Sequence, residues 1–133
     1  MLPRKSFTET NSYYLLSEHF PEVANRHLRD LFAEDDDRFN KFSIRFGEIL
    51  LDYSKNRITE DTKQLLIQLA EECGVKEAIE AMFNGEKINE TEGRAVLHTA
   101  LRNPATSGVI TDGKDIMPDI HQVLQQMEQF CIS

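Results

Sequence analysis

Apolar residues recur at helical spacing along most of the chain and predict a succession of short helices. The first predicted helix runs from Ser12 to Phe20, where Pro21 should end or kink it. A second helix is expected from Glu22 to Ala33. The acidic cluster Glu34–Asp37 follows and lacks the spaced oxygen ligands and the glycine of a calcium loop. We interpret this cluster as a solvated turn and the start of a helix.

Between residues 42 and 53 the period of the apolar pattern changes. Phe42, Ile44 and Phe46 alternate with polar residues, Gly47-Glu48 can turn the chain, and the apolar stretch Ile49–Tyr53 follows. This pattern predicts a small β-hairpin near residues 42–53. A single hairpin is marginally stable in water, so we expect it to pack on helices.

Two further helices are predicted in the middle of the chain, each with a terminal signal. Thr59 is a good N-cap for a helix whose apolar stripe runs through Cys73 to Gly74, a natural C′ residue. A short helix carrying Ala78 to Phe83 should stop before Gly85.

The last part of the chain predicts two more helices. Asn89 and Glu92 have the residue types of a capping pair, so a helix is expected behind them through Leu101. Val109 to Thr111 can be briefly extended, and Asp112-Gly113 is a turn signal. The clearest helix lies at Ile116–Cys131, with Asp115 as its cap. The predicted fold is therefore mainly α, a bundle-like helical segment with one small hairpin.

Composition limits the function classes. The chain has 133 residues, 40% of them hydrophobic and 29% charged, which suits one globular domain or one piece of a larger one. Its net charge of −8 disfavours nucleic acid and anionic membranes as partners. The N-terminal sequence has no apolar run of a secretion signal, and no stretch approaches the roughly 18 apolar residues of a membrane span. A cytoplasmic location is expected.

No metal or cofactor is expected from the cysteines and histidines. Cys73 and Cys131 form no CxxC pair and fall at apolar helix positions, so we expect buried thiols. The four histidines do not pair with one another or with cysteine at the spacing of metal ligands; they are His19, His27, His98 and His121.

Some polar side chains leave a functional alternative open. Arg94, His98 and Arg102 would share one face of the predicted helix and could bind an anion together. A structural histidine with two surface arginines is favoured, because anion sites usually add backbone N–H groups. For the other candidates we favour structural roles: a helix terminator at Gly85-Glu86-Lys87, a turn and helix cap at Asp112–Asp115, and packing at Tyr13-Tyr14.

Five segments resemble the glucose-6-phosphate isomerase (phosphoglucose isomerase) family. They occur in the family's order with matching gaps, which is more specific than any single motif, and are His27–Ala33 together with Arg38-Phe39, Leu51–Thr59, Ala81–Asn89, Thr91–Asn103 and Val109–Pro118. One departure lies at residues 104–107, where Pro-Ala-Thr-Ser stands and relatives often show Arg-Ser-Asn-Thr.

The resemblance implies that residues 1–133 are the N-terminal helical segment of such an isomerase, leading into two absent α/β sugar-isomerase subdomains. Family members interconvert glucose 6-phosphate and fructose 6-phosphate in glycolysis and gluconeogenesis, through an enediol formed by a catalytic Glu, and are homodimers. The family's catalytic residues come from later sequence, so no catalytic, cofactor-binding or metal-binding residue is assigned here.

Two hypotheses follow from the resemblance. In the first, the chain is a structural part of the enzyme and is inactive alone, and its apolar stripes at residues 96–101 and 116–131 are exposed in part. In the second, it is a free-standing helical interaction module. We favour the first.

Overall fold

The computed structural model describes residues 6–104 and 108–132, which form two compact units. Of the described residues, 6–73 make up the N-terminal unit, and 74–104 and 108–132 make up the C-terminal unit. The mainly α fold with a small antiparallel hairpin is confirmed. Within the described ranges, no helix is both long and apolar enough to cross a membrane.

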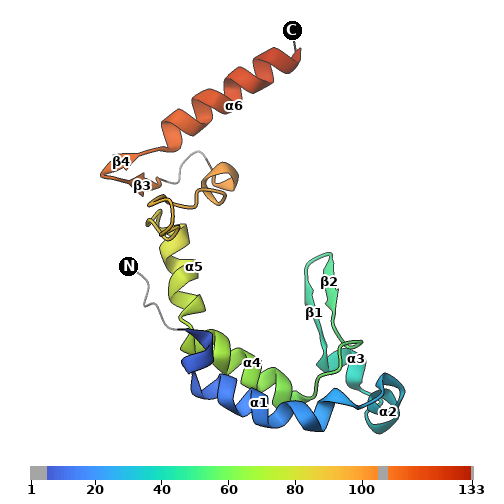
Figure 1. The fold of residues 1–133 in the computed structure, drawn as a ribbon. Coiled ribbons are helices and arrows are strands. Elements are labelled where there is room, and N and C mark those ends of the chain that lie inside the picture. Colours follow the sequence, from blue (N-terminus) through green and yellow to red (C-terminus); the bar gives the residue numbers. More distant parts are fainter. Residues whose placement is uncertain (1–5, 105–107, 133) are drawn as a thin grey trace. The chain divides into compact units, whose positions relative to one another are not determined.

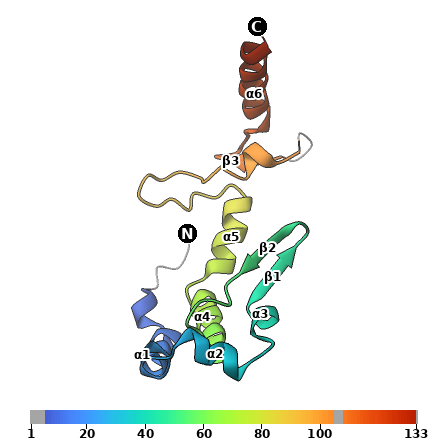
Figure 2. The ribbon, with the colours of Figure 1, turned by 90° about the vertical axis from the view of Figure 1, so that its right-hand side faces the viewer.

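Helices α1 (Asn11–Ala24) and α4 (Glu60–Glu72) lie side by side in the N-terminal unit (Figures 1 and 2). A one-turn 3-10 helix, η1 (Phe7–Glu9), precedes α1. Both α1 and α4 begin at a threonine cap: the Thr10 side chain accepts from the Tyr13 N–H, and the Thr59 side chain accepts from the Thr62 N–H. The predicted N-cap at Thr59 is thus confirmed.

The predicted boundary at Pro21 is wrong, because α1 continues through Pro21 to Ala24. Burial of Val23 and a hydrogen bond of 2.8 Å from Arg57 Nη1 to the Ala24 carbonyl hold this last turn. Tertiary contacts of this kind can offset the intrahelical hydrogen bond that proline lacks. The predicted helix 22–33 is consequently divided, and α2 (Leu28–Glu34) starts after a separate cap, His27.

Glu72, at the end of α4, joins that helix to the beginning of α1. Its carboxylate accepts the Asn11 N–H and the Ser12 N–H, both at 3.0 Å, and the Ser12 hydroxyl. These groups lie at the N-terminus of α1, where backbone N–H groups have no intrahelical acceptor and the helix dipole favours a negative charge. One side chain therefore fixes the register of the two packed helices.

We expect Glu72→Ala to destabilise the N-terminal unit by about 2 kcal/mol, because two backbone donors and a buried hydroxyl lose their acceptor. All three tyrosines of the chain lie in this unit and there is no tryptophan, so urea unfolding followed by tyrosine fluorescence reports on it alone. Glu72→Gln keeps one acceptor oxygen, so its free energy of unfolding should lie between those of the unchanged chain and Glu72→Ala. The exposed Glu71→Ala is the control, and an equal effect from it would contradict this role of Glu72.

The predicted hairpin is confirmed as β1 (Ser43–Phe46) paired antiparallel with β2 (Ile49–Asp52). It follows the short helix α3 (Arg38–Lys41) and extends from it away from α1 and α4 (Figure 1). The Tyr53 N–H donates to the Phe42 carbonyl at 2.9 Å and closes the base of the hairpin, where Phe42 is buried and the two rings meet edge to face.

Arg38 organises the loop between β2 and α4, and sequence reasoning had given it no such role. Its side chain is almost fully buried at 3% exposure and donates to three backbone carbonyls, those of Ser54, Asn56 and Ile58, at 2.8–3.0 Å. The guanidinium also lies over the Phe42 ring at 4.4 Å from its centroid. A single arginine therefore replaces the regular backbone pairing that this loop lacks.

In the C-terminal unit, a small core forms around Ala100, Val109 and Met117. The helices and strands of this unit are α5 (Val75–Phe83), the 3-10 helix η2 (Ala100–Arg102), the two-residue strands β3 (Ile110–Thr111) and β4 (Lys114–Asp115), and α6 (Met117–Ile132). Three predictions are confirmed here: the left-handed Gly74 after α4, the end of α5 before Gly85, and the extended residues before the Asp112-Gly113 turn.

The helix predicted behind Asn89 is wrong. Asn89 does accept the Glu92 N–H at 3.4 Å, as a cap would, but its backbone pairs with that of Arg94 in both directions. Gly93, at φ +63°, reverses the chain between them. Leu97 then packs against the small core. The closed turn and this burial outweigh the helical propensity of residues 94–99.

The apolar stripe of α6 is largely exposed, as expected for residues 116–131. Val123, Met127 and Phe130 are all more than half exposed. The expectation of buried thiols is wrong for Cys131, which is exposed, while Cys73 is half-buried. The physical reason is that the core of the C-terminal unit reaches only the first turns of α6.

Candidate functional site

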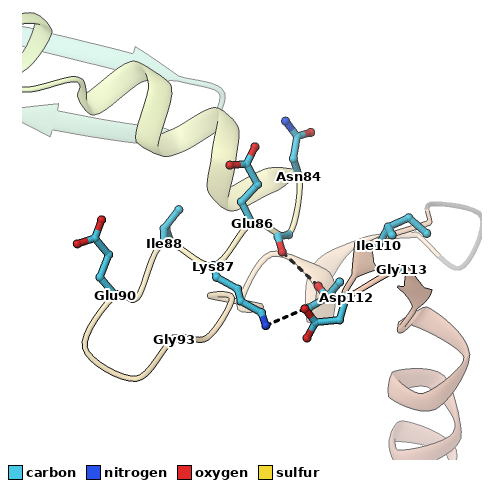
Figure 3. A pocket seen from close by; sticks show the side chains of 11 residues that line it. Asn84, Glu86, Lys87, Ile88, Glu90, Gly93, Ile110, Asp112 and Gly113 are labelled. Atoms are coloured by element: carbon cyan, nitrogen blue, oxygen red, sulfur yellow. Dashed lines mark hydrogen bonds and ion pairs between the residues drawn. The ribbon is translucent and has the colours of Figure 1, made fainter. Parts of the chain in front are cut away.

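A hollow with a volume of about 600 Å³ lies in the C-terminal unit (Figure 3). Its walls are the turn after α5, the loop that follows and the tip of the β3–β4 hairpin. The lining residues are Asn84, Gly85, Glu86, Lys87, Ile88, Glu90, Gly93, Ile110, Thr111, Asp112 and Gly113.

Gly85 brings the two walls of this hollow together. Its φ of +75° ends α5, and its carbonyl accepts the Thr111 hydroxyl at 3.2 Å. A Cβ at this position would lie 2.9 Å from the Ile110 carbonyl oxygen and 3.1 Å from a Val109 methyl. Only glycine therefore combines this backbone conformation with such a close approach of the strand.

An ion pair crosses the same hollow. Lys87 Nζ lies 2.7 Å from Asp112 Oδ1, and both side chains are about half exposed or more, at 49% and 69%. Asp112 sits in the turn of the hairpin at φ +53°, followed by Gly113 at φ +77°. Because both partners are open to water, the pair contributes little to the stability of this turn.

The residues Arg94, His98 and Arg102 are not presented on one helical face. No helix contains Arg94 or His98, and all three residues are exposed. Arg102 Nη1 donates to the His98 carbonyl at 3.1 Å, so its guanidinium supports the local backbone. The favoured structural interpretation is consistent with this placement, and the shared anion-binding face is wrong because the helix it required does not form.

Other polar candidates have structural partners. Asp115 caps α6 by accepting the Met117 N–H at 3.1 Å, as predicted, and also accepts the Val109 N–H at 3.3 Å. Tyr13 packs edge to face on Phe7, with the ring centroids 5.4 Å apart, which agrees with a packing role.

The histidines of the N-terminal unit serve the helix ends. His19 bonds Thr62 Oγ1 at 2.8 Å and Glu22 at 3.0 Å, next to the cap of α4. His27 accepts the Arg29 N–H through Nδ1 at 3.1 Å. The pairing of His19 with Thr62 spans 43 residues, so no sequence signal could reveal it.

The acidic cluster forms a solvated turn, as predicted. Asp35 accepts the Lys41 ammonium at 2.8 Å, and this bond holds the pKa of the Asp35 carboxyl below its usual value. In the residues that the structure describes, no three His, Cys, Asp or Glu side chains come close enough to share a metal ion.

Comparison with known proteins agrees with the resemblance in the sequence. The family model for phosphoglucose isomerase matches residues 52–133. The chain is also 54% identical over 123 residues to the glucose-6-phosphate isomerase of Methylococcus capsulatus (strain ATCC 33009 / NCIMB 11132 / Bath). That match covers 92% of this chain and 22% of the relative, so the chain spans about a fifth of the relative's length. The chain belongs to the phosphoglucose isomerase family.

Proposed function

We propose that residues 1–133 form the N-terminal helical segment of a glucose-6-phosphate isomerase, which interconverts glucose 6-phosphate and fructose 6-phosphate. The observation that carries the proposal is the 54% identity over nearly the whole chain to a protein of that name. The segment has a structural role, and the Glu that forms the enediol lies in sequence beyond it. The substrate of the complete protein is thus a sugar phosphate.

Side-chain chemistry supports the absence of a catalytic role for this segment. In the hollow beside Gly85, the Lys87 ammonium is paired with the Asp112 carboxylate and both side chains are open to solvent, whereas a general acid or base must be held against the reacting substrate. We further propose that the complete protein needs no cofactor, is a homodimer and is cytoplasmic, as its family membership implies.

A chimera tests the proposed function. In the Methylococcus capsulatus enzyme, the matching segment is replaced by residues 1–133 of this chain. The turnover of fructose 6-phosphate is then measured for this chimera and for the 133-residue chain alone. We expect turnover by the chimera and none by the chain. An inactive but folded chimera would favour the alternative, a free-standing helical interaction module. Turnover by the chain alone would overturn the assignment of catalysis to later sequence.

The double variant Glu86→Gln/Lys87→Met tests whether the hollow contributes to catalysis. In the active chimera, we expect kcat/KM to stay within about twofold of the parent, because the proposed function places the reacting groups in later sequence. Asp61→Asn/Lys63→Met, in α4 of the N-terminal unit, is a matched control for the change of charge. A fall in kcat/KM of the first variant alone, with unchanged circular dichroism, would place Glu86 or Lys87 in the catalytic machinery.

A further inference from the structure

One face of the β1–β2 hairpin consists entirely of large apolar side chains. Cross-strand partners lie on the same face of an antiparallel pair, so the register Ile44↔Leu51 and Phe46↔Ile49 places these four residues together. Their exposed fractions are 57%, 58%, 81% and 69%, respectively. The opposite face carries the pairs Ser43↔Asp52 and Arg45↔Leu50 and is mostly polar.

Such a face is unfavourable in water. Two-stranded hairpins are marginally stable unless one face packs on another layer, and the contacts at the base of this hairpin leave the four side chains exposed. Figures 1 and 2 show the hairpin reaching outward from α3, free of α1 and α4. The hairpin therefore presents an apolar surface to a further partner.

The size of the face indicates which partner covers it. Four residues on two strands make a patch on the order of 13 Å by 10 Å, whereas stable interfaces between separate proteins bury about 800 Å² on each side. A contact within one polypeptide does not have to offset the loss of translational freedom, so a small patch suffices there.

We propose that the face formed by Ile44, Phe46, Ile49 and Leu51 docks on the polypeptide that follows residue 133 in the complete isomerase. This inference rests on the proposed function, because it needs the remaining chain whose length the relative indicates: the matched stretch is 22% of that protein. The hairpin is then the arm by which the helical segment attaches to the rest of the enzyme, with Phe46 at its outermost turn.

Hydroxyl-radical labelling of side chains in the chimera and in the dilute 133-residue chain tests the docking. We expect labelling of Phe46 and Ile49 to fall several-fold in the chimera and to remain high in the chain, while the opposite-face Leu50 changes less. Equal labelling in both proteins would overturn the proposal. Protection in the dilute chain would assign the face to residues 1–133 themselves, and protection that grows with the concentration of the chain would assign it to a second copy.

A pair of variants supplies a second measurement. Phe46→Lys should lower the unfolding temperature of the chimera but leave tyrosine-detected unfolding of the isolated chain unchanged, because the side chain loses contacts only where the face is covered. Leu50→Lys, on the opposite face of the same hairpin, is the matched control and should have a smaller effect in the chimera. Both readouts are independent of turnover, so an inactive chimera with a protected hairpin would contradict the proposed function but support the docking.

Discussion

Arg38→Met is expected to destabilise the N-terminal unit by about 3 kcal/mol, the largest effect of any single substitution considered for this unit. The change removes the Arg38 donor from the carbonyls of Ser54, Asn56 and Ile58, of which Asn56 keeps the Ile58 N–H, and it removes the cation from the face of the Phe42 ring. Methionine keeps most of the aliphatic volume, so the loss reports mainly on hydrogen bonds and the cation–π contact. Urea unfolding followed by tyrosine fluorescence measures it.

Two further variants sharpen this result. Arg38→Lys keeps the charge but cannot reach three carbonyls from one planar group, so we expect roughly half of the loss. Arg29→Met, at an exposed position of α2, controls for the removal of an arginine. If Arg38→Met unfolded at the same urea concentration as Arg29→Met, the three carbonyls would have found other donors and the organising role of Arg38 would be wrong.

The second large effect is expected at Gly85, where alanine should cost the C-terminal unit about 3 kcal/mol. About a third of this comes from φ +75°, which an L side chain rarely adopts. The remainder comes from the Cβ, which would stand 2.9 Å from the Ile110 carbonyl oxygen and force β3 away from the end of α5. Amide hydrogen exchange should accelerate in β3, because the strand moves away from α5 and the Thr111 hydroxyl loses its bond to the Gly85 carbonyl.

Gly113→Ala is a matched control that measures the part of this loss due to the positive φ alone. Gly113 has nearly the same φ, +77°, but an added Cβ would meet no atom within 4 Å. We therefore expect Gly113→Ala to lower the stability of the C-terminal unit by about 1 kcal/mol, from the backbone conformation alone. The tyrosines all lie in the N-terminal unit, so tyrosine-detected unfolding should not change in either variant. Equal losses for the two glycines would show that the close approach of β3 to Gly85 contributes nothing.

Local signals in the sequence were sufficient for several elements. The Thr59 cap, the left-handed Gly74, the end of α5 before Gly85 and the Asp115 cap all depend on groups within three or four residues of one another. Alternating apolar residues likewise predicted the β1–β2 hairpin, because its register follows from pairs close in the chain. In each case the interaction that forms the element is encoded next to it.

Where long-range contacts compete with local propensity, prediction from the sequence failed. Pro21 was expected to end or kink the first helix, but α1 continues to Ala24, whose carbonyl accepts a hydrogen bond from Arg57, 33 residues away. The residue types of a cap at Asn89 and Glu92 predicted a helix, yet Leu97 packs against the small core that includes the distant Met117, and the local pairing of Asn89 with Arg94 closes a turn instead. The helical face that Arg94, His98 and Arg102 would have shared does not form for the same reason.

The candidate site shows the same division. From the sequence alone, Gly85-Glu86-Lys87 and Asp112–Asp115 were two separate turns, 25 residues apart. The tertiary structure brings them together through the Lys87–Asp112 pair and the Thr111–Gly85 bond. No pattern in either turn signals the other, because the ion pair and the bond depend on how β3 approaches the end of α5.

The sequence by itself determined the family, the mainly α class, most helix ends and the hairpin, since these follow from ordered sequence blocks and from interactions between near neighbours. Only the tertiary structure decided that Arg38 holds the loop before α4, that Glu72 joins two helices, and that residues 84–99 contain no helix. These features depend on contacts between residues far apart in the chain, and the free energy of such contacts exceeds the small local preferences that a sequence pattern reports.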